Sequence, residues 1–257
     1  MGSILEWATL MNDALPQTLS TSPAPDARLW ALVPCAGNGS RAQANGPKQY
    51  APVAGQPMVV HTLAALRGVR RLAGTLVVVS AGDTFFESGN ATVLVAACGG
   101  STRAETVFNG LKALQGLGAQ AHDWVLVHDA ARCLVTPSQI DALIDSCLDD
   151  PVGGLLALKL PDTLKQEANG RVAKTIERGD KWLAQTPQMF RLEALQEALQ
   201  AAGDAVTDES SAMEFMGLQP RLVEGSAQNF KVTYPQDFAL AEAVLAGRNG
   251  SSLLDGR

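Results

Sequence analysis

The stretch VPCAGNGSRAQANGPKQY, residues 33–50, begins at the last residue of the apolar run LWALV, residues 29–33. Three glycines interrupt it, and its only charged side chains are those of Arg41 and Lys48. Glycines allow backbone N–H groups to approach an anion closely, while an arginine offers phosphate oxygens a planar fork and a lysine a mobile point charge. The pattern indicates a phosphate-binding loop at the end of a buried strand. The simpler alternative is a basic surface loop.

This loop differs from two common nucleotide-binding signatures. The GxxxxGK-S/T pattern of P-loop proteins is absent. The spacing of Gly37 and Gly39 resembles a dinucleotide fingerprint, with Ala42 at the third position. However, Pro47 and Lys48 fall where the helix of such a motif should continue. The loop alone therefore favours nucleotide phosphates.

Apolar runs and helix-like segments alternate along the chain. Short, β-rich runs with almost no charge occupy residues 29–33, 75–80, 92–97, 124–128 and 153–159. Helical patterns occupy residues 58–66, 102–114 and 138–148. This alternation predicts an α/β, Rossmann-like fold, with a mostly parallel sheet and helices on both faces. Ligands of such sheets lie at the carboxyl ends of the strands, where both the glycine loop and HDAARCLV, residues 128–135, are expected.

One segment breaks the alternation. Asn169–Gly170 is a strong type I′ turn signal between two polar runs, and it predicts a β-hairpin over about residues 163–177. The hairpin is too polar to form part of the core, so we expect an arm that packs on a second subunit. An exposed hairpin on a monomer is the alternative.

Composition limits the class of protein. The chain has 257 residues and a formal net charge of -6, with 46% hydrophobic and 18% charged residues. These values are typical of a globular enzyme and unfavourable for a nucleic-acid-binding protein, because such binding depends on neutralising phosphates. An anionic substrate must then meet a local group of cations. The four cysteines show no metal-ligand spacing, which favours reduced thiols in a cytoplasmic protein.

The sequence also suggests a domain organisation. Residues 1–27 contain no lysine or arginine and no unbroken apolar core, so they do not resemble a signal peptide. We expect a flexible N-terminal extension over residues 1–27, one folded domain over residues 28–247 and a flexible tail over residues 248–257. No segment is apolar enough to predict a membrane span.

Several motifs resemble those of one enzyme family. PCAGNGSR followed by PKQY is similar to the P-A-A-G-x-G-x-R…P-K-Q signature of cytidylyltransferases that activate polyol phosphates. The resemblance to the 2-C-methyl-D-erythritol 4-phosphate cytidylyltransferase family extends from about residue 32 to 245, in the family's order. It is carried by GGSTRAETVFNGL, VHDAAR, DTLK, LAQTPQMF, TDESSAMEFMG, VEGSAQNFKVT and PQDFALAE.

The resemblance implies a nucleotidyltransferase fold, a reaction and a set of partners. CTP and the polyol phosphate would give a CDP-polyol and pyrophosphate, through in-line attack of the substrate phosphate on the α-phosphorus. No general base is needed, and no Ser/His/Asp constellation is evident. Mg²⁺ or another divalent cation would be held mainly by the CTP phosphates, with Asp129 as the one candidate protein ligand. The hairpin would join a homodimer whose two active sites are shared between subunits.

The resemblance also assigns roles to residues. Arg41 and Lys48 match the catalytic cations. The residues expected to bind CTP are Cys35, Ala36, Gly37, Asn38, Gly39, Gly100, Ser101, Arg103, Thr106, Asp129 and Ala130. Those expected to bind the polyol phosphate are Asp129, Thr163, Lys165, Arg178, Thr186 and Lys231. The chain departs from the family pattern at Cys35, where alanine is usual, at Ser101, where an acid is common, and at Cys133, where proline is usual.

Three alternative functions remain open at this level. The first is a cytidylyltransferase for another polyol phosphate, such as ribitol 5-phosphate. The second is a catalytically silent nucleotide-binding regulator, which the presence of both Arg41 and Lys48 disfavours. The third is a nicotinamide-dependent oxidoreductase, for which Asp83 is the only candidate ribose-binding acid. We interpret the acids of TDESS, Asp208 and Glu209, as a helix cap and first turn.

Overall fold

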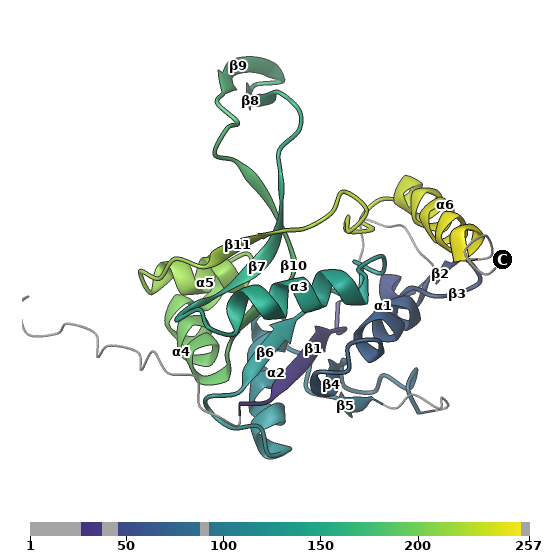
Figure 1. Cartoon of the computed structure of the whole chain (residues 1–257), viewed down its shortest axis with the longest axis vertical. Helices are drawn as coiled ribbons and strands as arrows, with labels where there is room; N and C mark the ends of the chain where they lie inside the picture. Colours follow the sequence, from purple (N-terminus) through teal and green to yellow (C-terminus); the bar gives the residue numbers. More distant parts are fainter. Residues whose placement is uncertain (1–26, 38–45, 88–92, 253–257) are drawn as a thin grey trace, which may run out of the picture.

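The computed structural model describes residues 27–37, 46–87 and 93–252, without the side chains of Asp204 and residues 249–252. Its centre is a seven-stranded sheet in the order β11-β7-β10-β6-β1-β4-β5 (Figure 1). Strand β10 runs antiparallel to both of its neighbours, and the other pairings are parallel. The strands are β1 (Leu29–Pro34), β4 (Leu72–Val78), β5 (Leu94–Ala96), β6 (Trp124–Val127), β7 (Gly153–Lys159), β10 (Trp182–Arg191) and β11 (Arg221–Glu224).

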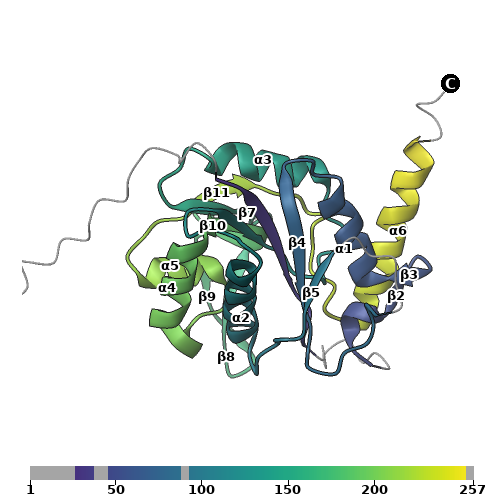
Figure 2. The same cartoon turned by 90° about the horizontal axis from the view of Figure 1, so that it is seen from below.

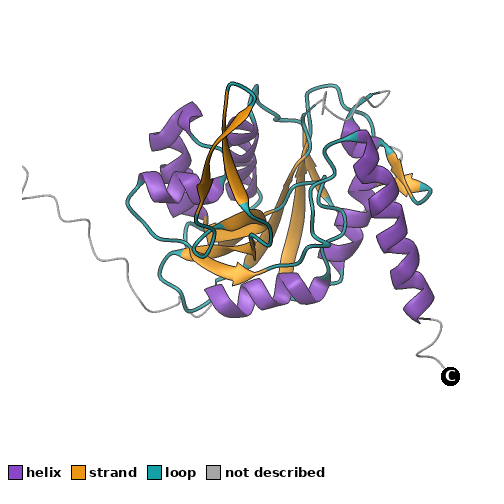
Figure 3. Cartoon of the chain, turned by 90° about the horizontal axis from the view of Figure 1, so that it is seen from above, coloured by secondary structure: helices purple, strands orange, loops and turns teal. Residues whose placement is uncertain are grey.

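Helices cover both faces of this sheet, as the sequence predicts. Successive β1 side chains point to opposite faces. Ala31 and Val33 belong to one core cluster with residues of α1 (Met58–Arg67) and α3 (Pro137–Cys147). Trp30 and Leu32 belong to another with residues of α2 (Arg103–Gly116) and α4 (Leu192–Ala202). Figure 2 shows α3 and α2 on opposite sides of the sheet, and Figure 3 shows the same layering from above.

Side-chain caps fix where the helices of the site begin. Thr102 accepts a hydrogen bond from the backbone N–H of Glu105 at the start of α2. Thr136 forms a capping box at the start of α3, with Pro137 in the first turn. Asp208 caps α5 (Glu209–Phe215), so the interpretation of TDESS as a helix start is confirmed. The three predicted helices and five predicted strands are all present, with boundary differences of a few residues.

Several further elements are not predicted by the sequence pattern. They are β10, β11, α4, the terminal α6 (Pro235–Ser252), the short β2 (Pro52–Val53) and β3 (Gln56–Pro57), and the 3-10 turns η2 (Lys48–Tyr50) and η3 (Gly203–Ala205). Helix α6 contributes Phe238 and Val244 to a third apolar cluster, which contains Val53, Met58 and Val232. This packing holds the C-terminal segment against the loops that follow β1 and β6. No helix in the described part of the chain is long and apolar enough to cross a membrane.

The predicted hairpin is present and stands away from the body of the molecule (Figure 1). Strands β8 (Leu164–Ala168) and β9 (Arg171–Ile176) form their own two-stranded sheet. Asn169 and Gly170 have φ angles of 53° and 74°, the left-handed pair that a type I′ turn requires. Val172 leaves 65% of its surface exposed. The hairpin thus exposes an apolar side chain outside the core of its own subunit.

Candidate active site

A cleft of about 430 Å³ lies at the carboxyl ends of β1 and β6, where the sequence predicts a ligand. Four segments and one residue of the C-terminal part line it. The lining residues are Pro34, Cys35, Ala36, Gly37, Lys48, Gln49, Gly100, Ser101, Thr102, Arg103, Thr106, Asp129, Ala130, Ala131 and Lys231. The structure therefore brings together the predicted CTP-binding residues that it describes. Asn38, Gly39 and the predicted catalytic Arg41 lie outside the described residues.

The described start of the glycine loop is held by hydrogen bonds. Cys35 N–H donates to the carbonyl oxygen of Val78 at 2.7 Å, which extends the β1–β4 pairing by one residue. The side-chain amide of Gln49 donates to the Cys35 carbonyl at 2.8 Å, and the Ser80 hydroxyl donates to the Ala36 carbonyl at 2.9 Å. Burial raises the pKa of the Cys35 thiol to about 12, so this residue stays neutral. The loop thus leaves β1 in a fixed direction.

The second wall of the cleft is the start of α2. The N–H of Gly100 donates to Thr106 Oγ1 at 3.1 Å, which folds the loop back on the first helical turn. Both the N–H and the hydroxyl of Ser101 donate to Glu105 Oε2, at 2.6 and 2.7 Å. A Cβ atom at Gly99 would lie 2.3 Å from the Ala36 Cβ, so only glycine permits this approach of the two loops.

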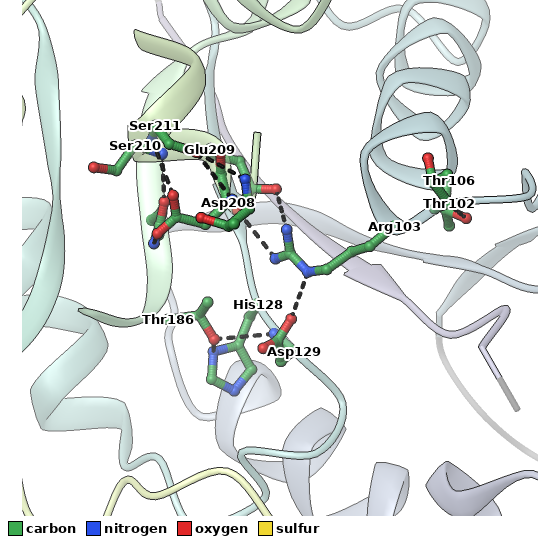
Figure 4. A network of polar contacts seen from close by, with 12 residues as sticks. Thr102, Arg103, Thr106, His128, Asp129, Thr186, Asp208, Glu209, Ser210 and Ser211 are labelled. Carbon is green, nitrogen blue, oxygen red and sulfur yellow. Dashed lines mark hydrogen bonds and ion pairs between the residues drawn. The ribbon is translucent and has the colours of Figure 1, made fainter. Parts of the chain in front are cut away.

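Ion pairs join Glu209, Arg103 and Asp129 at the cleft (Figure 4), and Lys231 extends them from the C-terminal segment. Arg103 Nε lies 2.9 Å from Asp129 Oδ1, and Lys231 Nζ lies 2.7 Å from Asp129 Oδ2. The other end of the Arg103 guanidinium meets Glu209. Burial alone would raise the pKa of the Asp129 carboxyl, but the charges of Arg103 and Lys231 outweigh it and hold that pKa below its ordinary value. Asp129 is therefore a carboxylate at neutral pH.

The backbone of Asp129 is fixed by two buried side chains behind it. The Asp129 N–H donates to Thr186 Oγ1 at 3.0 Å, and Thr186 Oγ1 lies 3.0 Å from His128 Nδ1. His128 Nε2 lies 3.2 Å from the Arg132 carbonyl oxygen, which can only accept, so the proton belongs on Nε2. The Thr186 hydroxyl then donates to Nδ1. Thr186 thus does not line the cleft, and its one hydroxyl proton is donated to His128 Nδ1.

The predicted polyol-phosphate residues of the hairpin do not reach this cleft within one subunit. Thr163, Lys165 and Arg178 are exposed, and none of them lines it. Lys165 donates to Thr175 Oγ1 at 2.8 Å across the hairpin, and Arg178 donates to the carbonyl oxygen of Pro161. Their proposed contact with substrate therefore requires a second subunit, and it stays a prediction.

Two contributions to the site are missed by the sequence analysis. Gln49 lines the cleft and fixes Cys35, and the signal available for it is its place in the PKQY motif. Glu209 forms an ion pair with Arg103. The sequence analysis misses this role because the helix cap at Asp208 already accounts for the acids of TDESS. Asp83, the acid that a nicotinamide enzyme would need, accepts hydrogen bonds from Tyr50 and from the Phe85 N–H instead.

The donor set fits a cation that is held mainly by phosphates. Among the described residues, no group of three or more His, Cys, Asp or Glu side chains can hold a metal ion. Asp129 is the only acid among the described residues that line the cleft. Mg²⁺ keeps several waters and is commonly bound by one or two carboxylates together with substrate phosphates. One carboxylate at the cleft is consistent with that mode.

The fold and the site define a nucleotide-binding α/β protein of the nucleotidyltransferase class. The model of the family described as IspD, 2-C-methyl-D-erythritol 4-phosphate cytidylyltransferase, matches residues 29–247. The chain is 51% identical over 229 residues to the protein of that name from Paraburkholderia phytofirmans, covering 85% of this chain and 96% of the relative. The chain belongs to the 2-C-methyl-D-erythritol 4-phosphate cytidylyltransferase family.

Solved structures of the family have the same fold, and one relative is much longer than this chain. A crystal structure of 4-diphosphocytidyl-2C-methyl-D-erythritol synthase superposes with a TM-score of 0.77 at 38% identity, covering 86% of this chain and all of the other. The enzyme from Thermus thermophilus gives a TM-score of 0.70 at 31% identity, with 84% and 98% covered. A bifunctional IspD/IspF enzyme from Albidiferax ferrireducens is 70% identical over 86% of this chain. The chain spans 54% of that relative's length.

Proposed function

We propose that this chain transfers CMP from CTP to 2-C-methyl-D-erythritol 4-phosphate, giving 4-(cytidine 5'-diphospho)-2-C-methyl-D-erythritol and pyrophosphate. The observation that carries this proposal is the cleft, which combines the glycine loop, Lys48, Asp129 and Lys231 in a chain of this family. The relatives of about 50% identity are named for that activity and are covered almost completely. These names disfavour the silent regulator, the oxidoreductase and a different polyol phosphate as substrate.

The reaction is a displacement at phosphorus. A phosphate oxygen of the polyol phosphate attacks the α-phosphorus of CTP, and the bond from that phosphorus to the β-phosphate bridging oxygen breaks, so that pyrophosphate leaves. A phosphate monoester is already largely a dianion at neutral pH, since its second pKa is about 6, and no general base is required. His128 is fully buried and committed to Thr186 and Arg132, which agrees with a mechanism without a base.

The protein's part is then positioning and charge neutralisation. We expect Lys48 and Arg41 to stabilise the charge that develops on the α-phosphate. Cys35, Ala36, Gly37 and the start of α2 would contact the phosphates and the base of CTP. Lys231 would meet the polyol phosphate, while Asp129 orients Lys231 and Thr186 holds the Asp129 backbone.

We further propose that a divalent cation, Mg²⁺ in the first instance, completes the site. When bound, it would neutralise part of the charge of the phosphates. Asp129 is the residue of this chain placed to meet it, directly or through a water molecule. EDTA should abolish pyrophosphate release, and excess Mg²⁺ should restore it.

A homodimer in the cytoplasm is the setting we propose for the reaction. The exposed hairpin and its outward-facing Val172 support the dimer, because such an arm gains stability only by packing on another surface. Free thiols at Cys35, Cys98, Cys133 and Cys147 support a reducing compartment.

Pyrophosphate release tests the proposed function. The protein is incubated with each of the four nucleoside triphosphates and Mg²⁺, with and without 2-C-methyl-D-erythritol 4-phosphate. Release is expected with CTP only, and only when the polyol phosphate is present. Ribitol 5-phosphate serves as the second acceptor, and faster release with it would replace our choice of substrate. Absence of release with both acceptors would overturn the assignment to cytidylyl transfer.

A further inference from the structure

Glu209 is a fully buried carboxylate that lies just outside the cleft. It is the first residue of α5, and its side chain has no exposed surface. Both of its oxygens accept hydrogen bonds from the Arg103 guanidinium, from Nη1 at 2.7 Å and from Nη2 at 3.0 Å. Arg103 lines the cleft, whereas Glu209 does not. The ion pair therefore connects α5 to Arg103, a residue that lines the cleft (Figure 4).

The position of Glu209 is fixed from both sides by one residue of β10. Gln188 Oε1 accepts a hydrogen bond from the Ser210 N–H at 2.7 Å. Gln188 Nε2 donates to Asp208 Oδ2 at 2.8 Å. The Asp208 side chain also caps the helix by accepting from the Ser211 N–H at 2.9 Å. Because both chain neighbours of Glu209 are held, its carboxylate presents a fixed target to Arg103.

The ion pairs alternate in sign from α5 to the C-terminal segment. Glu209 binds the outer fork of Arg103, Arg103 Nε binds Asp129 at 2.9 Å, and Lys231 binds the other Asp129 oxygen at 2.7 Å. A guanidinium is rigid and planar, so a partner that fixes its two outer nitrogens also fixes the direction of Nε. Glu209 thus sets the place from which Arg103 holds Asp129.

We propose that Glu209 is a positioning residue for the cytidylyl transfer, acting through Arg103 on Asp129 and Lys231. This inference rests on the proposed function. Glu209 does not line the cleft, and its carboxylate binds both outer nitrogens of the Arg103 guanidinium. Loss of the carboxylate charge would loosen the Arg103 guanidinium and weaken its hold on Asp129 Oδ1, which leaves Lys231 as the other cation on that carboxylate.

The test is the Glu209→Gln variant, which keeps the size of the side chain and removes its charge. We expect kcat to fall about 10- to 100-fold, the scale of a misplacement of about 1 Å in a reacting group. The KM for CTP should change by less than about threefold, because the missing interaction is not with the nucleotide. Steady-state pyrophosphate release gives both constants.

A matched control separates positioning from a general loss of stability. Asp123 is also a fully buried carboxylate with an arginine partner, Arg28, at 3.2 Å, but it lies at the opposite end of β6 from the cleft. Asp123→Asn should lower the urea midpoint of unfolding while leaving kcat within about twofold of wild type. A second measurement asks whether the effects of Glu209 and Arg103 on kcat depend on each other, which a purely structural role of Glu209 would not require. If Glu209 acts through Arg103, the double variant Glu209→Gln/Arg103→Lys should lose no more kcat than the worse single variant.

Each outcome decides the proposal. A wild-type kcat in folded Glu209→Gln would overturn it, as would a double variant whose loss equals the product of the single losses. If Glu209→Gln does not fold by circular dichroism, Glu209→Asp decides instead. The aspartate retains the charge, but its side chain is one methylene shorter. We expect kcat to fall severalfold, and an unchanged kcat would overturn the proposal. If the wild-type protein has no cytidylyltransferase activity, both the proposed function and this inference are wrong. If the wild-type protein is active and the Glu209 variants keep its kcat, the inference alone is wrong.

Discussion

The Nζ atom of Lys48 donates a hydrogen bond to the carbonyl oxygen of Val232 at 2.6 Å, although 184 residues separate them in sequence. Val232 follows Lys231, whose Nζ binds Asp129. It also belongs to the apolar cluster on which α6 packs. The two cations that we expect to meet different phosphates therefore enter the cleft at one junction, and the C-terminal helix supports that junction.

Replacement of Lys48 tests its predicted catalytic role. Lys48→Ala should lower kcat about 10²- to 10³-fold, the scale observed when one preorganised donor to a developing charge is removed. Arg41→Ala should do the same. Pyrophosphate release under saturating substrates measures the effect. Lys112, an exposed lysine of α2, supplies the control, since Lys112→Ala should leave kcat unchanged. Near-normal turnover in either test variant would remove that residue from the proposed machinery.

Base selection gives a second prediction. CTP and UTP differ by an amino group against a carbonyl oxygen at one ring position. A backbone carbonyl that accepts from the amine of cytosine would face an oxygen of uracil with no donor between them, and a site built on hydrogen bonds rejects the wrong partner strongly. We expect the backbone of residues 35–36 and 100–106 to impose a preference for CTP of at least about 10²-fold in kcat/KM. Equal kcat/KM values for CTP and UTP would contradict it.

The parallel part of the fold is predictable from sequence because its strands are buried on both faces. Residues 29–33 and 124–127 carry almost no polar side chains, so their character is visible without any partner. Strand β10 is different. Gln185 and Thr186 are buried polar residues whose partners, Ser226 and Asn229, lie more than 40 residues away. A local pattern cannot represent such pairing, and β10 therefore escapes prediction.

The candidate site follows the same division. The glycines and cations of the loop over residues 33–50 predict phosphate binding because glycine, arginine and lysine can each contact phosphate oxygens without a distant partner. Arg103 is predicted to contact CTP, yet the sequence gives no sign that its fork is already held by Glu209, 106 residues away. Asp208 fits the local pattern of a helix cap. Because that pattern accounts for the TDESS motif, it gives no reason to expect that Glu209 binds Arg103. Long-range ion pairs are the part of the site that requires the structure.

The buried His128 predicts a pH dependence of stability. Burial lowers the pKa of its imidazole to about 4, whereas an exposed histidine has a pKa of about 6.5. Between these values the unfolded chain binds a proton that the folded chain does not, so the free energy of unfolding falls as pH is lowered. The loss should amount to about 3 kcal/mol between pH 6.5 and pH 4. Urea unfolding at a series of pH values measures it.

A variant isolates this contribution. His128→Asn keeps an acceptor near Thr186 and removes the titrating group, so its stability should be nearly constant between pH 6.5 and pH 4.5. Asp129 does not interfere in this range. Its folded pKa lies below its ordinary value of about 3.9, so it withdraws stability only as pH falls below about 4. The same slope in His128→Asn and in wild type would assign the pH dependence to other groups.

Arg178 provides the test of a shared active site. It lies at the base of the hairpin, outside the cleft of its own subunit, and its guanidinium donates to the carbonyl oxygen of Pro161. If the hairpin crosses to a second subunit, Arg178→Ala should raise the KM for the polyol phosphate about 10-fold or more while the Kd for CTP stays unchanged, because a charged hydrogen bond contributes about 1.5–3 kcal/mol. Calorimetric titration with CTP supplies the binding control.

Mixing two inactive variants then decides which subunit Arg178 serves. In a two-fold dimer whose sites each combine Lys48 of one chain with Arg178 of the other, a mixed dimer of Lys48→Ala and Arg178→Ala chains contains one site with both wild-type residues and one with neither. Random exchange makes half of the dimers mixed, so about a quarter of wild-type activity should return if the sites act independently. Exchange is verified by mass spectrometry with one isotopically labelled chain. Activity that stays at the level of the separate variants after verified exchange would mean that Arg178 acts within its own chain or not at all.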